Sequence, residues 1–135
     1  MPGTIEIGRK GFRGLRAVHP SRDDAVIVDC RGLVDPAYLR NNRGKAIRNP
    51  NVNTLACVVS KLLEDQYDAT QKLVARVVEG VEAGKLVHVR CLMGKHRSQA
   101  VVSLAMNALD EMHAKDPNSG LYEGPHYLGT IKPTE

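Results

Sequence analysis

The sequence predicts a single α/β domain, a three-layer sandwich with a central, mostly parallel sheet. Two continuous β-branched runs, residues 25–30 and 86–90, are typical of strands buried on both faces of a parallel sheet. Amphipathic helical patterns lie between and after these runs, and alternation of strand and helix is characteristic of the α/β class. A buried strand, a short turn and a helix follow one another around residues 86–98, which is a favourable arrangement for binding phosphate.

The elements before the second β-branched run each have a local signal. Residues 4–7 alternate polar and apolar side chains as a short strand does, and a basic turn containing three glycines follows. Asn53 or Thr54 can cap a first helix, because an apolar face begins directly after them. That face consists of Leu55, Val58, Val59, Leu62 and Leu63.

Two more helices are expected. Asp68 and Gln71 resemble a capping box that opens a second helix, and Gly84 is placed to end it. Residues 98–113 have apolar side chains at helical spacing and predict the third helix. We expect the domain to comprise residues 1–115, with residues 116–135 forming an irregular segment packed on it.

The composition is that of an ordinary globular domain. The chain has 135 residues, of which 42% are hydrophobic and 25% are charged, enough to form one core. It contains neither a long apolar run nor a secretory signal pattern, so we expect a cytoplasmic protein without a membrane partner. The cysteines Cys30, Cys57 and Cys91 have no metal-ligand spacing, so we expect reduced thiols, no metal site and no cofactor.

The positive charge is unevenly distributed. The net charge is +4, and basic residues dominate residues 1–16, 31–48 and 85–97. This clustering favours an anionic partner, while scattered solvated charge is the alternative interpretation.

The segment from Cys91 to Ser98 carries the clearest chemical signal. Inward-pointing turn amides and the start of a helix provide N–H donors for an anion, and Arg97 can add two parallel hydrogen bonds. Lys95 and His96 add positive potential at the mouth of this loop. The predicted anion-binding residues of the loop are Cys91, Leu92, Met93, Gly94, Lys95, His96, Arg97 and Ser98.

Cys91 and Arg97 also have the C-x5-R spacing of protein tyrosine phosphatases, followed by Ser98. In that chemistry Cys91 is the nucleophile, with a thiol pKa lowered by the amides and Arg97, and Ser98 stabilises the thiolate as it leaves. The alternative is a buried structural cysteine beside an exposed turn. Catalysis is therefore a separate hypothesis from anion binding.

A phosphatase also requires a general acid, for which Asp29 and Asp35 are the candidates. Parallel strands that end at the same sheet edge would bring Asp29 and Arg31 near the Cys91 loop. Asp29 could instead be an acceptor that orients Arg97 or the loop amides. Asp35 could be an ordinary turn carboxylate.

The chain resembles the C-terminal domain of the RNase adapter protein RapZ and its YvcJ-type relatives. The family's G-C-T-G-G-x-H-R-S loop is matched by the segment from Arg90 to Ser98, R-C-L-M-G-K-H-R-S. The family's D-x-R-x-L-x-N-P turn is matched by D-C-R-G-L-V-D-P, from Asp29 to Pro36. The resemblance runs from about residue 4 to residue 112 and implies an α/β fold.

The resemblance implies a pocket for a phosphorylated small molecule of the amino-sugar phosphate kind. The residues implied are Asp29, Arg31, Cys91, Gly94, His96 and Arg97. In the family this domain also engages small regulatory RNA and forms homo-oligomers. Leu92 and Met93 replace the family's Thr and Gly, so the ligand can differ, and Asp35 replaces an Asn, which adds a titratable acid.

Three classes of function follow from these residues. The first is a regulatory domain that binds a sugar phosphate, and the second is a cysteine-dependent phosphatase with the same pocket. The third is an RNA-binding adapter, for which we expect weak electrostatic binding. The sequence has no GxxxxGK[ST] motif, and its last twenty residues contain only one lysine, Lys132. Aromatic residues make up 4% of the chain, so side chains on which bases could stack are scarce.

Overall fold

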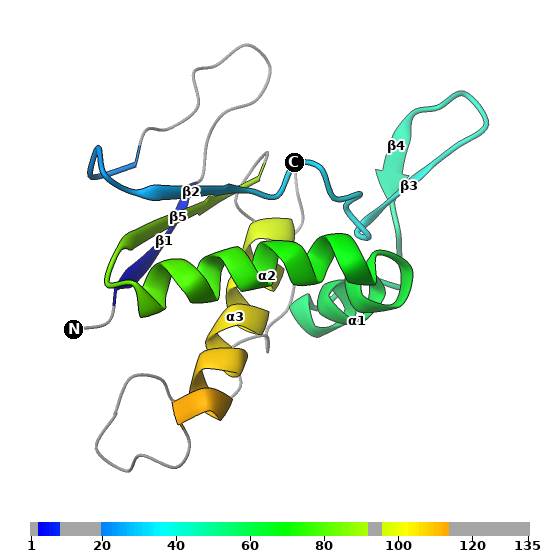
Figure 1. Cartoon of the computed structure of the whole chain (residues 1–135). Helices are drawn as coiled ribbons and strands as arrows, with labels where there is room; N and C mark the ends of the chain where they lie inside the picture. Colours follow the sequence, from blue (N-terminus) through cyan, green and yellow to red (C-terminus); the bar gives the residue numbers. More distant parts are fainter. Residues whose placement is uncertain (1–2, 9–19, 92–95, 114–135) are drawn as a thin grey trace.

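The computed structural model describes residues 3–8, 20–91 and 96–113, and it confirms the α/β class (Figure 1). Strands and helices follow one another along the chain and form a parallel sheet packed against helices, with a small antiparallel hairpin beside them. The elements are β1 (Thr4–Gly8), β2 (Val26–Asp29), β3 (Tyr38–Arg40), β4 (Ala46–Arg48), α1 (Leu55–Asp65), α2 (Tyr67–Glu82), β5 (Leu86–Arg90) and α3 (Arg97–His113).

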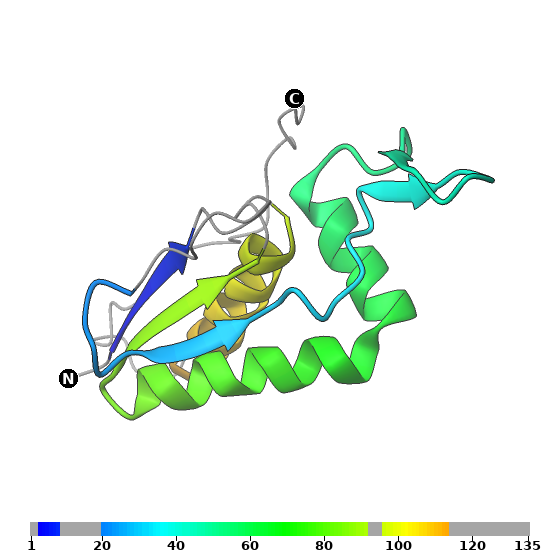
Figure 2. The same ribbon diagram turned by 90° about the horizontal axis from the view of Figure 1, so that it is seen from above.

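The parallel sheet has the strand order β1-β5-β2, with β5 in the centre. Val28 pairs with Val89 and Asp29 pairs with Arg90, so β2 and β5 end side by side. All three strands point the same way in the view from above (Figure 2). The prediction that Asp29 lies at the same sheet edge as the start of the Cys91 loop is therefore confirmed.

Helices α2 and α3 contact each other and lie on the same face of the sheet (Figure 1). Val28, Val87 and Val89 point from the sheet into one core cluster with the apolar side chains of all three helices. Gly80 allows α2 to approach closely, because a Cβ there would lie 2.5 Å from Val87 Cγ2. Within the described part of the chain the helices form one layer, so the third layer of the predicted sandwich stays a prediction.

The ends of α1 and α2 are fixed in different ways. Thr54, one of the two predicted caps, caps α1, since its hydroxyl accepts the Cys57 amide at 3.1 Å. The predicted capping box at Asp68 is wrong, because α2 already begins at Tyr67 after Gln66. The Gln66 side chain instead contacts Val34, accepting its amide at 2.8 Å and donating to its carbonyl at 2.9 Å. It therefore fixes the segment after β2 to the α1–α2 junction.

The end of α2 and the start of α3 lie at or near their predicted positions. Gly84 follows α2 with a φ of 75°, which confirms the predicted glycine stop. Helix α3 begins at Arg97, one residue before its predicted start.

No helix among the described residues is long and apolar enough to cross a membrane. The predicted irregular segment, residues 116–135, lies outside the described residues, as does residue 9 onward of the basic glycine turn.

Candidate functional site

Arg97, the first residue of α3, connects this helix to the chain segment that follows β2. Its Nη1 donates to the carbonyl oxygens of Leu33 at 2.8 Å and Arg31 at 3.2 Å. Its Nε is buried and has no hydrogen-bond partner among the residues that the structure describes. Because Nη1 is fixed by the backbone, the edge formed by Nε and Nη2 is the one available for two parallel hydrogen bonds to an anion.

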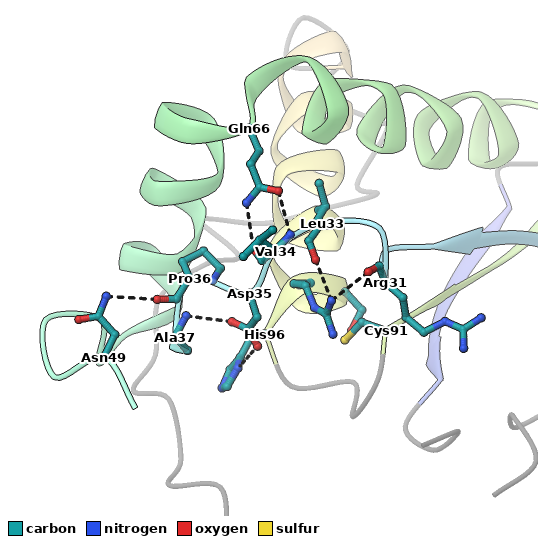
Figure 3. Close-up of polar contacts among 12 residues, drawn as sticks. Arg31, Leu33, Val34, Asp35, Pro36, Ala37, Asn49, Gln66, Cys91 and His96 are labelled. Atoms are coloured by element: carbon teal, nitrogen blue, oxygen red, sulfur yellow. Dashed lines mark hydrogen bonds and ion pairs between the residues drawn. The ribbon is translucent and has the colours of Figure 1, made fainter. Parts of the chain in front are cut away.

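His96 and Asp35 form a second link between the same two segments (Figure 3). His96 Nδ1 lies 2.8 Å from Asp35 Oδ2, and the His96 side chain is only 3% exposed. Asp35 Oδ1 accepts the amide of Ala37 at 2.9 Å, so both carboxylate oxygens have a partner. His96 Nε2 is buried without a hydrogen-bond partner in the described ranges.

The environment of Asp35 favours its charged form. Burial raises the pKa of the Asp35 carboxyl, but the hydrogen bonds from His96 and Ala37 and the charge of Arg97 lower it below its ordinary value. A carboxylate only accepts hydrogen bonds, so His96 Nδ1 carries the proton that is shared with it. His96 Nε2 is consequently an acceptor in the neutral ring and a donor in the charged ring.

Cys91 and Ser98 lie on either side of the loop and contact each other. Both side chains are buried, and Cys91 Sγ donates to Ser98 Oγ at 3.2 Å. The strand β5 ends at Arg90 and α3 begins at Arg97, so the strand and the helix expected from the sequence are present. The contact brings together the two residues to which sequence reasoning assigned the nucleophile and its stabilising hydroxyl.

Asp29 and Arg31 form a separate pair. The Arg31 guanidinium donates to both oxygens of Asp29, with the shortest distance, 2.6 Å, between Nη2 and Oδ2. Burial raises the pKa of the Asp29 carboxyl, but its hydrogen bonds with Arg31 bring it below the ordinary value. Asp29 thus orients Arg31 and not Arg97, whose Nη1 contacts two backbone carbonyls.

Arg31 and His96 do not lie together in the described structure. Figure 3 shows the Arg31 side chain pointing away from Asp35 and His96. The structure therefore joins Asp35, His96 and Arg97 through contacts with one segment, while Arg31 contributes its carbonyl to Arg97 and its side chain to Asp29. The remaining predicted residues, Leu92, Met93, Gly94 and Lys95, lie outside the described residues.

Sequence reasoning missed two contributions to this site. Tyr38 packs near the His96 ring at a centroid distance of 6.0 Å, and the Arg48 guanidinium carbon lies 5.8 Å from the centroid of Tyr38. The carbonyls of Arg31 and Leu33 hold Arg97, although no side-chain pattern can identify a backbone acceptor. The only available signal was the position of both residues inside the Asp29 to Pro36 motif.

The site has no metal-ligand character within the described residues. No group of three or more His, Cys, Asp or Glu side chains there could hold a metal ion. Arg97 Nε and His96 Nε2 are buried without a hydrogen-bond partner among the described residues, and buried polar atoms are usually hydrogen-bonded. A ligand or a neighbouring group could supply these bonds.

These features define a class of protein, an α/β domain whose polar site joins the ends of two parallel strands to the start of a helix. The family model of the RapZ C-terminal domain matches residues 10–117, and the chain belongs to this family. No curated protein and no solved structure matches the chain.

The Asp35–His96 pair predicts an acid-dependent contribution to stability. Because the pKa of Asp35 is lowered by folding, its contribution is present above the unfolded value, about 3.9, and is lost as the pH falls through the folded value. We expect Asp35→Ala to lower the free energy of unfolding at pH 7 by about 1–3 kcal/mol. Denaturant unfolding at pH 7 and pH 3 should show the difference from wild type shrinking at the lower pH.

Asp23→Ala is the matched control, because Asp23 is exposed. It should leave the unfolding free energy close to that of wild type at both pH values. A destabilisation by Asp35→Ala that is equally large at pH 3 would mean that the Asp35 charge does not stabilise the fold.

Proposed function

We propose that this domain binds a phosphate-bearing small molecule, of the amino-sugar phosphate class, in the loop from Cys91 to Ser98. The observation that carries the proposal is the fixed orientation of Arg97, whose Nη1 contacts two carbonyls while its buried Nε has no partner in the described part of the chain. A buried guanidinium N–H that is otherwise unsatisfied is stabilised by an anionic acceptor. Membership of the RapZ C-terminal domain family supports the same class of ligand.

Two neighbouring features favour the same ligand. The amides at the start of α3 lie next to Arg97, and the positive end of a 17-residue helix favours negative charge there. His96 Nε2 offers a further polar atom on the adjacent residue. We propose that Leu92, Met93, Gly94 and Lys95 complete the loop and that binding serves a regulatory or adapter role.

Calorimetric titration with inorganic phosphate and with a hexosamine phosphate tests this proposal. Loss of the paired guanidinium bonds in Arg97→Ala should cost about 2–3 kcal/mol, or nearly a hundredfold in affinity. Arg97→Lys should recover only part of the loss, because an ammonium group cannot provide the same pair of parallel bonds.

The matched control is Arg43→Ala, which removes the same charge from an exposed position on the hairpin. It should bind like wild type, and the unphosphorylated hexosamine should bind neither protein measurably. Equal affinity of wild type and Arg97→Ala for both phosphate ligands would overturn the assignment of the site.

A cysteine-dependent phosphatase is the second candidate, favoured by the 3.2 Å contact between Cys91 Sγ and Ser98 Oγ. In such a reaction the Cys91 thiolate attacks phosphorus, and the leaving oxygen takes a proton from a general acid. Both expected acids, Asp29 and Asp35, have a pKa below the ordinary value despite the opposing effect of burial. A carboxylate that is ionised at neutral pH is a poor proton donor, so we favour binding over turnover.

The test is hydrolysis of an aryl phosphate by wild type, Cys91→Ser and Cys57→Ser. We expect no turnover that depends on Cys91, while Cys91→Ser retains most of the phosphate affinity. Hydrolysis that persists in Cys57→Ser and disappears in Cys91→Ser would establish a phosphatase, and Asp29→Asn and Asp35→Asn would then identify its acid.

Alkylation at pH 6 measures whether the Cys91 thiol has a lowered pKa, and it should be carried out on the Cys57→Ser variant. Cys57 is half-buried near the start of α1, and hydrogen bonding with Thr54 lowers the pKa of its thiol. Cys57 therefore competes with Cys91 for the reagent, a complication that the sequence did not reveal. Cys30 is fully buried, and burial is the main cause that raises the pKa of its thiol to about 12.

RNA binding is a third and weaker proposal, based on the exposed side chains of Arg40, Arg43 and Lys45 on the β3–β4 hairpin. Binding through phosphates should weaken steeply with salt, and Arg43→Ala should reduce the slope of log affinity against log salt by about one. Filter binding at several salt concentrations measures this slope. Tight, sequence-selective binding that survives raised salt would contradict an electrostatic mode.

A further inference from the structure

Cys30 and Cys91 occupy adjacent positions at the ends of two neighbouring strands. The parallel register pairs Val28 with Val89 and Asp29 with Arg90, and the Cys30 amide donates to the Arg90 carbonyl at 2.7 Å. Continuing this register by one residue places Cys30 directly beside Cys91.

The two cysteines also share a face. Side chains alternate along each strand, so Cys30 and Cys91 point to the same side as Val28 and Val89. Both belong to the buried core cluster, with exposed fractions of 0% for Cys30 and 5% for Cys91. Burial is the main cause that raises the pKa of the Cys30 thiol, and the neighbouring Cys91 raises it further.

The spacing of the two strand ends is compatible with the Cα separation of a disulfide. Neighbouring strands lie about 4.8 Å apart, within the roughly 4.4–6.8 Å that a disulfide allows between Cα atoms. Cys57 belongs to α1 and not to the paired strands β2 and β5. Among the three cysteines of the chain, Cys30 and Cys91 are thus the two that the strand register places side by side.

We propose that Cys30 and Cys91 form a reversible, intramolecular disulfide when the protein meets a peroxide. In the first step the Cys91 sulfur attacks one oxygen of hydrogen peroxide, giving a sulfenic acid and water as the O–O bond breaks. In the second step the Cys30 sulfur attacks the Cys91 sulfur, and the leaving hydroxide takes the Cys30 proton and becomes a second water. Two thiols are oxidised and one peroxide is reduced.

The surroundings assign different roles to the two sulfur atoms. Cys91 lies at the start of the loop and contacts Ser98, so it is the sulfur nearer the site that a small oxidant would enter. Cys30 is fully buried, and its raised pKa keeps it as a thiol, which protects it from external oxidants. It reacts with oxidised Cys91 only because the two residues are adjacent, and it loses its proton to the leaving hydroxide in that step. Its resolving reaction would stop oxidation of Cys91 before the irreversible sulfinic acid forms.

Disulfide formation would draw Cys91 Sγ from Ser98 toward Cys30. The sulfur would then be unavailable for nucleophilic chemistry, while the contacts of Arg97 with the Arg31 and Leu33 carbonyls involve neither cysteine. The proposed pair is therefore independent of whether the loop binds phosphate or hydrolyses it.

Peptide mapping of the full chain after hydrogen peroxide treatment tests the pair. Remaining thiols are alkylated under denaturing conditions before digestion. We expect a peptide linked through Cys30 and Cys91, a chain mass lower by two hydrogen atoms, alkylation of Cys57, and full reversal by dithiothreitol. Sulfinic acid at Cys91 with alkylated Cys30, or disulfides that contain Cys57, would overturn the proposal.

Two variants separate the role of Cys30 from general oxidation. Cys57→Ser should form the same disulfide as wild type. Cys30→Ala should instead accumulate sulfinic acid at Cys91 that dithiothreitol does not reverse. The wild-type mapping decides the proposal even if Cys30→Ala does not fold, because it requires no substitution. Titration with phosphate in parallel distinguishes failure of the disulfide from failure of the proposed ligand site.

Discussion

The site depends on the two hydrogen bonds from Arg97 Nη1 to the carbonyls of Arg31 and Leu33. They join the first residue of α3 to the segment that leaves β2, across the edge where β2 and β5 end. Because a guanidinium is planar, fixing Nη1 also fixes the direction of Nε and Nη2. In the proposed binding mode, backbone positions would thus determine the orientation of the guanidinium before the anion arrives, which would lower the entropic cost of binding.

The two aspartates of the site form two separate polar pairs. Asp35 is paired with His96, and Asp29 is paired with Arg31, so each carboxylate already has a cationic or proton-donating partner. Arg97 forms no ion pair with a carboxylate in the described residues and satisfies part of its donor capacity with neutral carbonyls. This unpaired charge is what the proposed anion site requires. The same distribution disfavours acid catalysis, since neither aspartate is held in its protonated form.

Much of the framework could be predicted from the sequence because it depends on local patterns. The β-branched runs identified β2 and β5, Thr54 identified the start of α1, and Gly84 identified the end of α2. The resemblance to the RapZ C-terminal domain was also correct, because two motifs occur in the family's order.

The missed features depend on contacts between distant residues. Gln66, the residue before α2, contacts Val34, thirty-two positions away, and no local pattern indicates this contact. Asp29 lies at the predicted edge but bonds to Arg31, since that guanidinium is only two residues away and can reach both carboxylate oxygens. The proximity of Cys30 to Cys91 follows from strand order, because β5 lies directly beside β2 although the helices α1 and α2 separate them along the chain.

The most direct measurement is the NMR signal of the Arg97 Nε–H group during a titration with inorganic phosphate. If the free guanidinium edge receives the anion, this resonance should shift progressively and saturate, while the Nε–H resonance of exposed Arg43 remains in place. Phosphate that binds to the protein without shifting the Arg97 resonance would contradict the assignment of this edge as the anion-binding element.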